Sequence, residues 1–187
     1  MTEPRFRPLA ASELSDAQQD LATKLTRSPR GAVRGPYVPL IYSPDLADRM
    51  RHLGDFIRFE GVLPPRLKEI IIFAVARHWS VPYMFETHRE QSAALGLDRA
   101  IPDAIAAGRK PDGLAPAEQA AFDMAQELLR NFAASDATFA AARAHFDERG
   151  IIELVAFVGY YTALAMILNT AGIAPPEGAP PLAPIKG

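Results

Sequence analysis

Apolar residues recur at helical spacing along most of this chain, and the segments that carry them begin with residues typical of helix starts. One segment opens at Ser15-Asp16 and runs to about Leu25, and a second opens at Ser43-Pro44 and runs to about Phe59. Serine can cap a helix and proline fits its first turn, so both segments are predicted helices. The buried stripe predicted for the second helix consists of Leu46, Met50, Leu53, Phe56 and Ile57.

Residues 64–96 predict the centre of the fold, two helices joined by a tight corner. The first helix begins after Pro64-Pro65, and its residues 70–76 form an unbroken apolar run, which predicts burial on all sides. The corner is predicted at residues 79–82, because Pro82 disfavours helix at the residue before it. Gly96 supplies the left-handed end of the second helix.

Four more helical segments follow at residues 98–107, 116–131, 135–146 and 151–173. Arg149-Gly150 is predicted to interrupt the helical structure before the last of them. Residues 28–42, rich in glycine and proline, are predicted to be a loop. No segment alternates apolar and polar residues as strands do. The sequence therefore predicts an all-α, single-domain helical bundle of about seven helices.

The expected organisation is an arm, short helix and loop in residues 1–42, a helical domain in 43–174 and a proline-rich tail in 175–187. A chain of 187 residues can bury the core of one domain. RLKEIIIFAVARH and RGIIELVAFVGYY each place a glutamate before an apolar run. An internal duplication is one interpretation of this similarity between the two segments.

The charge and amino-acid composition argue against several classes of function. The net charge of −2 and the absence of a lysine- or arginine-rich run argue against nucleic acid as a partner. The chain has no cysteine, which excludes disulfides, thiol nucleophiles and thiolate metal ligands and fits a cytoplasmic location. Residues 151–173 have the length of a membrane span, with Glu153 as their one charged residue. They lack basic flanks, so a core or subunit-interface helix is expected and a membrane is not.

Glu69 and His88 form the candidate catalytic pair. Glu69 lies roughly 16 Å before the corner and His88 roughly 12 Å after it, so an antiparallel hairpin brings them to similar depth. Val81, Met84 and His88 follow a 3, 4 spacing and share a face that can look back toward Glu69. A carboxylate and an imidazole between apolar helices can transfer protons. The alternatives are a histidine satisfied in the core and a glutamate paired with Arg66 or another arginine.

These residues resemble the carboxymuconolactone decarboxylase / alkylhydroperoxidase D-like family over about residues 40–174. Its peroxidase branch carries a Glu and, after eleven residues, Cys-x-x-Cys-x-x-x-His; here that frame is Glu69, Val81, Met84 and His88, so the dithiol is absent. Tyr83 and His88 also match a segment common in cysteine-less relatives.

The resemblance implies a cofactor-free acid–base enzyme, a lyase or isomerase acting on a small organic acid or lactone of aromatic catabolism. It also implies self-association as dimers, trimers or hexamers. The alternatives are an antioxidant protein that has lost its dithiol and a non-catalytic oligomeric protein that binds a ligand.

The predicted catalytic residues are His88, Glu69 and Tyr83, with Tyr83 a donor to a substrate oxygen. No metal is expected, because the four histidines are scattered without a Glu-x-x-His or His-x-x-x-His spacing. No glycine-rich phosphate loop occurs, so no nucleotide cofactor is expected. The residues predicted to contact substrate are Met84, Val81, Arg34 of the 28–42 loop, Tyr161 and Asn169. Tyr161 and Asn169, eight residues apart, are expected to share a helix face and close the pocket.

Overall fold

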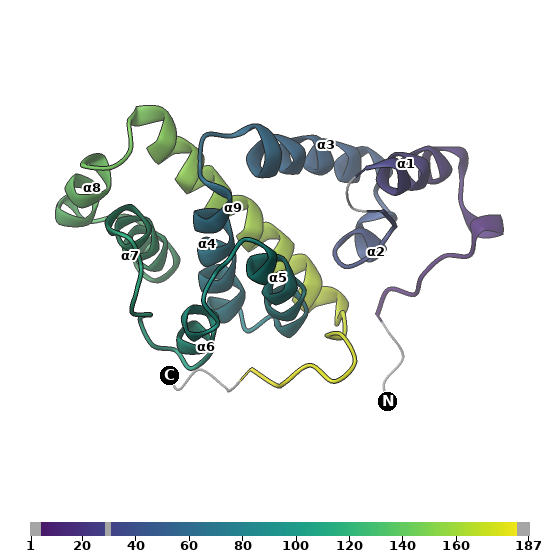
Figure 1. Ribbon diagram of the computed structural model, residues 1–187. Helices are drawn as coiled ribbons and strands as arrows, with labels where there is room; N and C mark the ends of the chain where they lie inside the picture. The colour runs from purple at the N-terminus through teal and green to yellow at the C-terminus, as the bar shows by residue number, and fades with distance from the viewer. Residues whose placement is uncertain (1–4, 29–30, 183–187) are drawn as a thin grey trace.

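The computed structural model describes residues 5–28 and 31–182, and every regular element within them is a helix (Figure 1). The predicted all-α fold is confirmed. A 3-10 turn, η1 (Ala11–Glu13), precedes α1, and a π-helical turn, η2 (Phe56–Glu60), extends α3. The α-helices are α1 (Asp16–Arg27), α2 (Tyr37–Leu40), α3 (Pro44–Asp55), α4 (Pro65–His78), α5 (Pro82–Ala94), α6 (Ala100–Ala106), α7 (Pro116–Asn131), α8 (Asp136–Arg143) and α9 (Glu148–Ala171).

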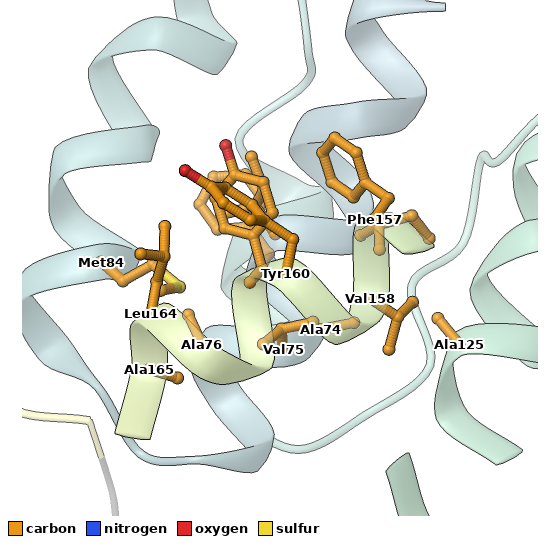
Figure 2. Packing of buried hydrophobic residues seen from close by; sticks show 14 of the residues in the cluster. Ala74, Val75, Ala76, Met84, Ala125, Phe157, Val158, Tyr160, Leu164 and Ala165 are labelled. Atoms are coloured by element: carbon orange, nitrogen blue, oxygen red, sulfur yellow. The ribbon is translucent and has the colours of Figure 1, made fainter. Parts of the chain in front are cut away.

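Helix α4 is the centre of the fold because its residues 70–76 are apolar on every side. Residues 70–76 are fully buried, as predicted. Helices α5, α6, α7 and α9 pack around α4, and Figure 1 shows α4 enclosed between α5 and α9. In Figure 2 the small side chains of residues 74–76 lie against α9, which supplies Phe157 and Leu164 to the same core. Alanines at this contact let the two helices approach closely.

The corner between α4 and α5 sets the geometry of the hairpin. Ser80 adopts the left-handed conformation with φ of 50°, and the Val81 N–H donates to the Ala76 carbonyl at 2.8 Å. Asn169 of α9 donates through Nδ2 to the Trp79 carbonyl at 2.7 Å. These bonds fix the direction in which α5 returns along α4.

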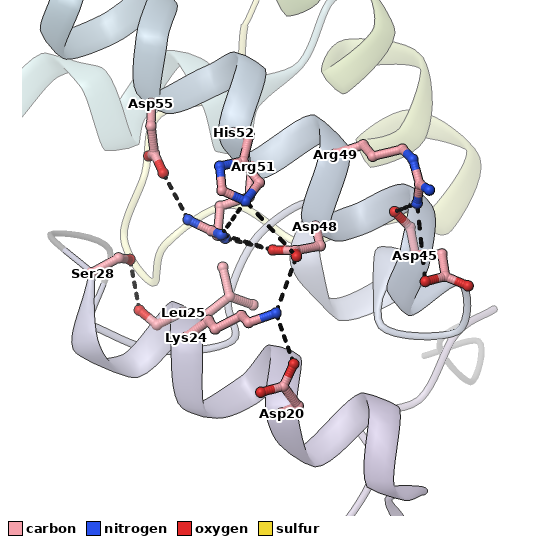
Figure 3. A network of polar contacts seen from close by, with 10 residues as sticks. All are labelled: Asp20, Lys24, Leu25, Ser28, Asp45, Asp48, Arg49, Arg51, His52 and Asp55. Carbon is pink, nitrogen blue, oxygen red and sulfur yellow. Dashed lines mark hydrogen bonds and ion pairs between the residues drawn. The ribbon is translucent and has the colours of Figure 1, made fainter.

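Helices α1 and α3 are joined by a polar network (Figure 3). Lys24 of α1 contacts Asp20 at 2.7 Å and reaches across to Asp48 of α3 at 3.1 Å. Arg51 then contacts Asp48 at 2.8 Å and Asp55 at 3.0 Å. Opposite charges alternate along the contact, so each has a partner of the other sign.

The prediction of which apolar residues of the segment 43–59 are buried is largely wrong. Leu46 is 50% exposed, Leu53 47% and Phe56 39%, whereas Ala47 and Ile57 are buried. Periodicity shows that apolar residues share one side of a helix, but it does not show which side meets the core. Here small residues and the charged network face the body, so the larger apolar side chains lie outward.

Two predicted boundaries also need correction. The segment 28–42, expected to be a loop, contains the short helix α2, and Ser43 makes no capping bond to α3. Arg149-Gly150 does not separate the last two helices, because both residues lie in the first turn of α9. The Gly150 N–H donates to the Asp147 side chain at 2.8 Å. The aspartate N-cap offsets the low helix propensity of that glycine.

Helix α9 crosses the back of the molecule (Figure 1). Among the described residues it alone is long and apolar enough to span a membrane, yet half of its apolar window is buried inside the protein. Its last turn is contacted by the N-terminal arm, where Arg5 donates to the Thr170 carbonyl at 3.0 Å. An arginine near the unpaired carbonyls of a helix end is favourable.

Candidate active site

Glu69 and His88 meet between α4 and α5, as the helix geometry predicted. Nδ1 of His88 lies 2.7 Å from Oε2 of Glu69. Glu69 is 4% exposed and His88 7%, so the bond is shielded from water. His88 also packs edge-on to the Tyr161 ring of α9, with ring centroids 5.9 Å apart. The histidine is therefore held from two sides.

Arg58 adds a positive charge to this pair. Its Nη2 lies 3.7 Å from Oε1 of Glu69 and donates to Oε1 of Gln91 at 2.7 Å. The alternative partner expected from the sequence, Arg66, binds Glu118 instead, at 2.7 Å. Glu69 thus lies between an imidazole and a guanidinium.

The π-helical turn η2 places Arg58. Lys68 of α4 lies beneath this turn and donates through Nζ to the Arg58 carbonyl at 2.9 Å. Burial lowers the pKa of Lys68, while the Glu153 carboxylate raises it and the Arg58 charge lowers it further. At the end of the turn the Val62 N–H donates to Glu153 of α9 at 2.6 Å. The arginine is therefore carried by a backbone segment that α4 and α9 both hold.

A cavity of about 450 Å³ opens beside His88. This volume suits a small organic molecule. Glu69 is not among the lining residues, so it contacts His88 from behind while the imidazole forms part of the wall. With Nδ1 bonded to Glu69, Nε2 is the ring nitrogen left for a ligand. Polar and aromatic side chains in the wall are Arg34, Arg58, Thr87, Gln91, Tyr37, Phe59, Tyr83, Tyr160 and Tyr161.

Three of the five residues predicted to contact substrate line this cavity, namely Arg34, Met84 and Tyr161, and so does Tyr83, which was predicted to be catalytic. Tyr83 lies against the loop that carries Arg34, since a Cβ built at Gly35 would be 2.7 Å from the Tyr83 ring. Gly35 also has a positive φ of 57°, a backbone conformation that residues with a side chain rarely adopt. Glycine at this position lets the loop close over the ring.

Val81 and Asn169 are not among the residues that line the cavity. Val81 is buried at the start of α5, and Asn169 holds the α4–α5 corner through Trp79. Residues eight apart on a helix differ by about 80° in direction at 100° per residue. Tyr161 therefore faces the cavity while Asn169 faces the corner, so the expected shared face is not found.

Sequence reasoning missed Arg58 and Gln91. Arg58 belongs to a π-helical turn, whose extra residue shifts the register that a 3.6-residue period assumes. Gln91 follows His88 by three residues, and that spacing on one helix face is a signal that could have identified it. No group of three metal-ligating side chains occurs in residues 5–28 and 31–182.

Residues 44–127 match the model of the carboxymuconolactone decarboxylase family. This segment includes Glu69, His88, Arg58 and Gln91, and the resemblance inferred from the sequence is confirmed. A search of curated proteins finds no match.

Solved structures of similar fold carry peroxidase-related or AhpD descriptions. An AhpD core from Ralstonia eutropha JMP134, described as an uncharacterized peroxidase-related protein, has a TM-score of 0.78 at 19% identity and covers 95% of this chain and 94% of its own. An uncharacterized peroxidase-related protein from Silicibacter sp. TM1040 has a TM-score of 0.76 at 16% identity, and the match covers 96% of this chain and 97% of that protein. A protein of unknown function from Agrobacterium tumefaciens, described as a candidate antioxidant defence protein AhpD, has a TM-score of 0.63 at 17% identity. That match covers 73% of this chain and 94% of the Agrobacterium protein. At these identities the likeness concerns the fold.

Proposed function

We propose that this carboxymuconolactone decarboxylase-like chain is a cofactor-free acid–base enzyme that decarboxylates a small organic acid or lactone of aromatic catabolism. The observation that carries the proposal is the buried 2.7 Å bond between Glu69 and His88 at the wall of a cavity lined by two arginines. A proton-transfer group, a partner that tunes it and a cationic site for a carboxylate are what such a reaction needs.

In the proposed reaction the bond between the substrate carbon and its carboxylate breaks. The electron pair passes into a conjugated carbonyl and forms an enolate, and CO₂ leaves. The protonated imidazole of His88 then gives its Nε2 proton to the carbon, which restores the carbonyl. His88 afterwards takes a proton from water, so each turnover consumes one proton and releases one CO₂.

Glu69 would stabilise the imidazolium that this step requires. The Glu69 carboxylate lies at hydrogen-bond distance from Nδ1 of His88 and fixes the Nδ1–H toward itself, which leaves Nε2 for the substrate. Arg58 would hold a carboxylate of the substrate, since its side chain lines the cavity and is 28% exposed. The Tyr83 hydroxyl would donate to the enolate oxygen, with Arg34 on the adjoining loop as a second cation.

The experiment is a screen of small lactones and conjugated carboxylic acids that follows CO₂ release. The test variant is His88→Asn, because the asparagine amide replaces Nδ1 as a donor to Glu69 but cannot deliver a proton. The matched control is His145→Asn, at an exposed histidine outside the cavity. Loss of at least a hundredfold in turnover for His88→Asn alone is expected. Equal turnover in both variants would contradict the assignment.

Two other functions are separated by simple assays. The peroxidase-related descriptions of the solved relatives motivate a test of peroxide consumption with a dithiol reductant. We expect none, because the chain has no cysteine to be oxidised. A non-catalytic protein would bind the same acids by calorimetry without releasing CO₂ or exchanging substrate hydrogen with solvent.

A further inference from the structure

The cavity beside His88 follows α5 along most of its length. Met84 lies in the first turn of α5, near the corner with α4, and Gln91 lies in its last turn, about 10 Å further along the axis. His88 lies between them, about one turn from each. On the facing helix α9, Leu168 adjoins the residue whose side chain bonds to that corner, so Leu168 belongs to the Met84 end. A ligand can therefore extend to either side of the imidazole.

The end of the cavity at Gln91, the polar end, carries a cation. Arg58 donates to Oε1 of Gln91 at 2.7 Å, and its side chain is 28% exposed. Thr87 lines the wall one turn before Gln91. Phe59 also lines the wall here, but it is 55% exposed and its ring centroid lies 5.6 Å from the Arg58 guanidinium. A guanidinium beside polar side chains suits a carboxylate.

The end at Met84, the apolar end, is lined by hydrocarbon and thioether groups. Leu164 and Leu168 lie one turn apart on α9 and both line the cavity, and Figure 2 shows Leu164 next to Met84. All three side chains are at most 7% exposed. Water at such a surface finds few polar partners, whereas an apolar group moves there favourably from solution. This end therefore suits an apolar part of a ligand.

Arg34 lies at the mouth of the cavity, because it is exposed and its loop borders the Tyr83 ring. An exposed guanidinium remains hydrated and gains little from an ion pair. A carboxylate placed among Met84, Leu164 and Leu168 would lose its hydration to apolar groups, which is costly. A second carboxylate on the ligand is therefore disfavoured at the apolar end.

We propose that the substrate of this site is an amphipathic acid, with its carboxylate on Arg58 at the polar end and an apolar substituent about the size of a phenyl ring at the apolar end. The inference rests on the proposed function, which places the reacting carbon between these groups, at Nε2 of His88. The cavity of about 450 Å³ has room for both, since sites of roughly 300–1,000 Å³ enclose drug-sized ligands. Met84, Leu164 and Leu168 then determine which acids are accepted.

The test is calorimetric binding of acids that do not react. Propionate, phenylpropionate and phenylpropionate with a second carboxylate at the para position lack the conjugated carbonyl that the decarboxylation needs, so their binding does not depend on turnover. Burial of the phenyl ring should make phenylpropionate bind at least tenfold more tightly than propionate. The para carboxylate should weaken binding at least tenfold relative to phenylpropionate.

Variants separate the two ends of the cavity. Leu164→Phe fills the apolar end and should weaken phenylpropionate at least fivefold more than propionate, whereas Arg58→Gln should weaken both acids alike. The matched control is Leu129→Phe on α7, because Leu129 has the same 7% exposure as Leu164 and is not among the lining residues. It should bind both acids like wild type. Circular dichroism shows whether each variant is folded, and the wild-type series decides alone if Leu164→Phe is not.

Three results would overturn the proposal. The first is equal affinity for propionate and phenylpropionate, and the second is tighter binding of the para dicarboxylate, which would assign the far end to a second anion. The third is a folded Leu164→Phe protein that binds phenylpropionate as wild type does. The expected order of affinities together with a negative screen for CO₂ release would refute the proposed reaction and still support the ligand class.

Discussion

The pair Glu69–His88 makes a quantitative prediction about stability that needs no substrate. His88→Ala removes the imidazole at 2.7 Å and leaves a carboxylate that is 4% exposed, with Arg58 at 3.7 Å as its remaining charged partner. Breaking a buried ion pair in this way costs about 3–5 kcal/mol. Because Arg58 stays in place, we expect the lower end, about 3 kcal/mol, which a domain stable by 5–15 kcal/mol tolerates.

The reasoning is tested by removing the charge of Glu69 first. In a Glu69→Gln background no buried carboxylate is left behind, so His88→Ala should cost only about 1–2 kcal/mol for a neutral hydrogen bond and some packing. The difference, about 1–2 kcal/mol, is the coupling between the two side chains. In an Arg58→Gln background the cost of His88→Ala should instead increase, because the compensating charge is gone.

The assay is urea unfolding at pH 7, with all variants at one protein concentration so that self-association does not enter the comparison. Contacting residues couple, whereas independent sites add within about 0.3–0.5 kcal/mol. Additive costs for Glu69→Gln and His88→Ala would mean that the buried bond does not hold an ionised carboxylate. An unchanged cost in the Arg58→Gln background would exclude the arginine from the pair.

Two further predictions concern the scaffold around the site. Gly61→Ala should lower the free energy of unfolding by about 1.5–3 kcal/mol, because the added Cβ would lie 2.6 Å from the Glu153 carboxylate that accepts the Val62 N–H. In a Glu153→Ala background, the same substitution should leave the free energy of unfolding, measured in urea, nearly unchanged. Burial, and then the charge of Arg130, lower the pKa of His78 below its usual 6.5, so the unfolded chain binds the proton first as the pH falls. Wild type should therefore lose stability below pH 6.5 more steeply than His78→Gln, and parallel pH profiles would contradict this.

The hairpin was predictable because its signals are local. Pro65 and Pro82 mark helix starts, Gly96 ends the second helix, and residues 70–76 are too apolar to lie anywhere but the core. Helix rise then sets the depth of Glu69 and His88 without knowledge of any other element. The contact between them followed from these facts.

Arg58 and the orientation of α3 were not predictable in this way. Whether Leu53 faces the core or the solvent depends on which neighbours α3 meets, and the network of Lys24 with Asp48 joins residues distant in sequence. A π-helical turn likewise has no local signature in its side chains, since it is held by Lys68 and Glu153 from two other helices.

The sequence by itself determined that this chain is helical, that it is centred on a helix with an unbroken apolar run at residues 70–76 and that it lacks thiol chemistry. Hydrophobic period, proline and glycine act over a few residues, and composition needs no structure at all. Only the tertiary structure decided which arginine approaches Glu69, which side chains line the cavity and which side of α9 faces outward. Those outcomes depend on the packing of helices far apart in the chain, and a period along one helix carries no information about its neighbours.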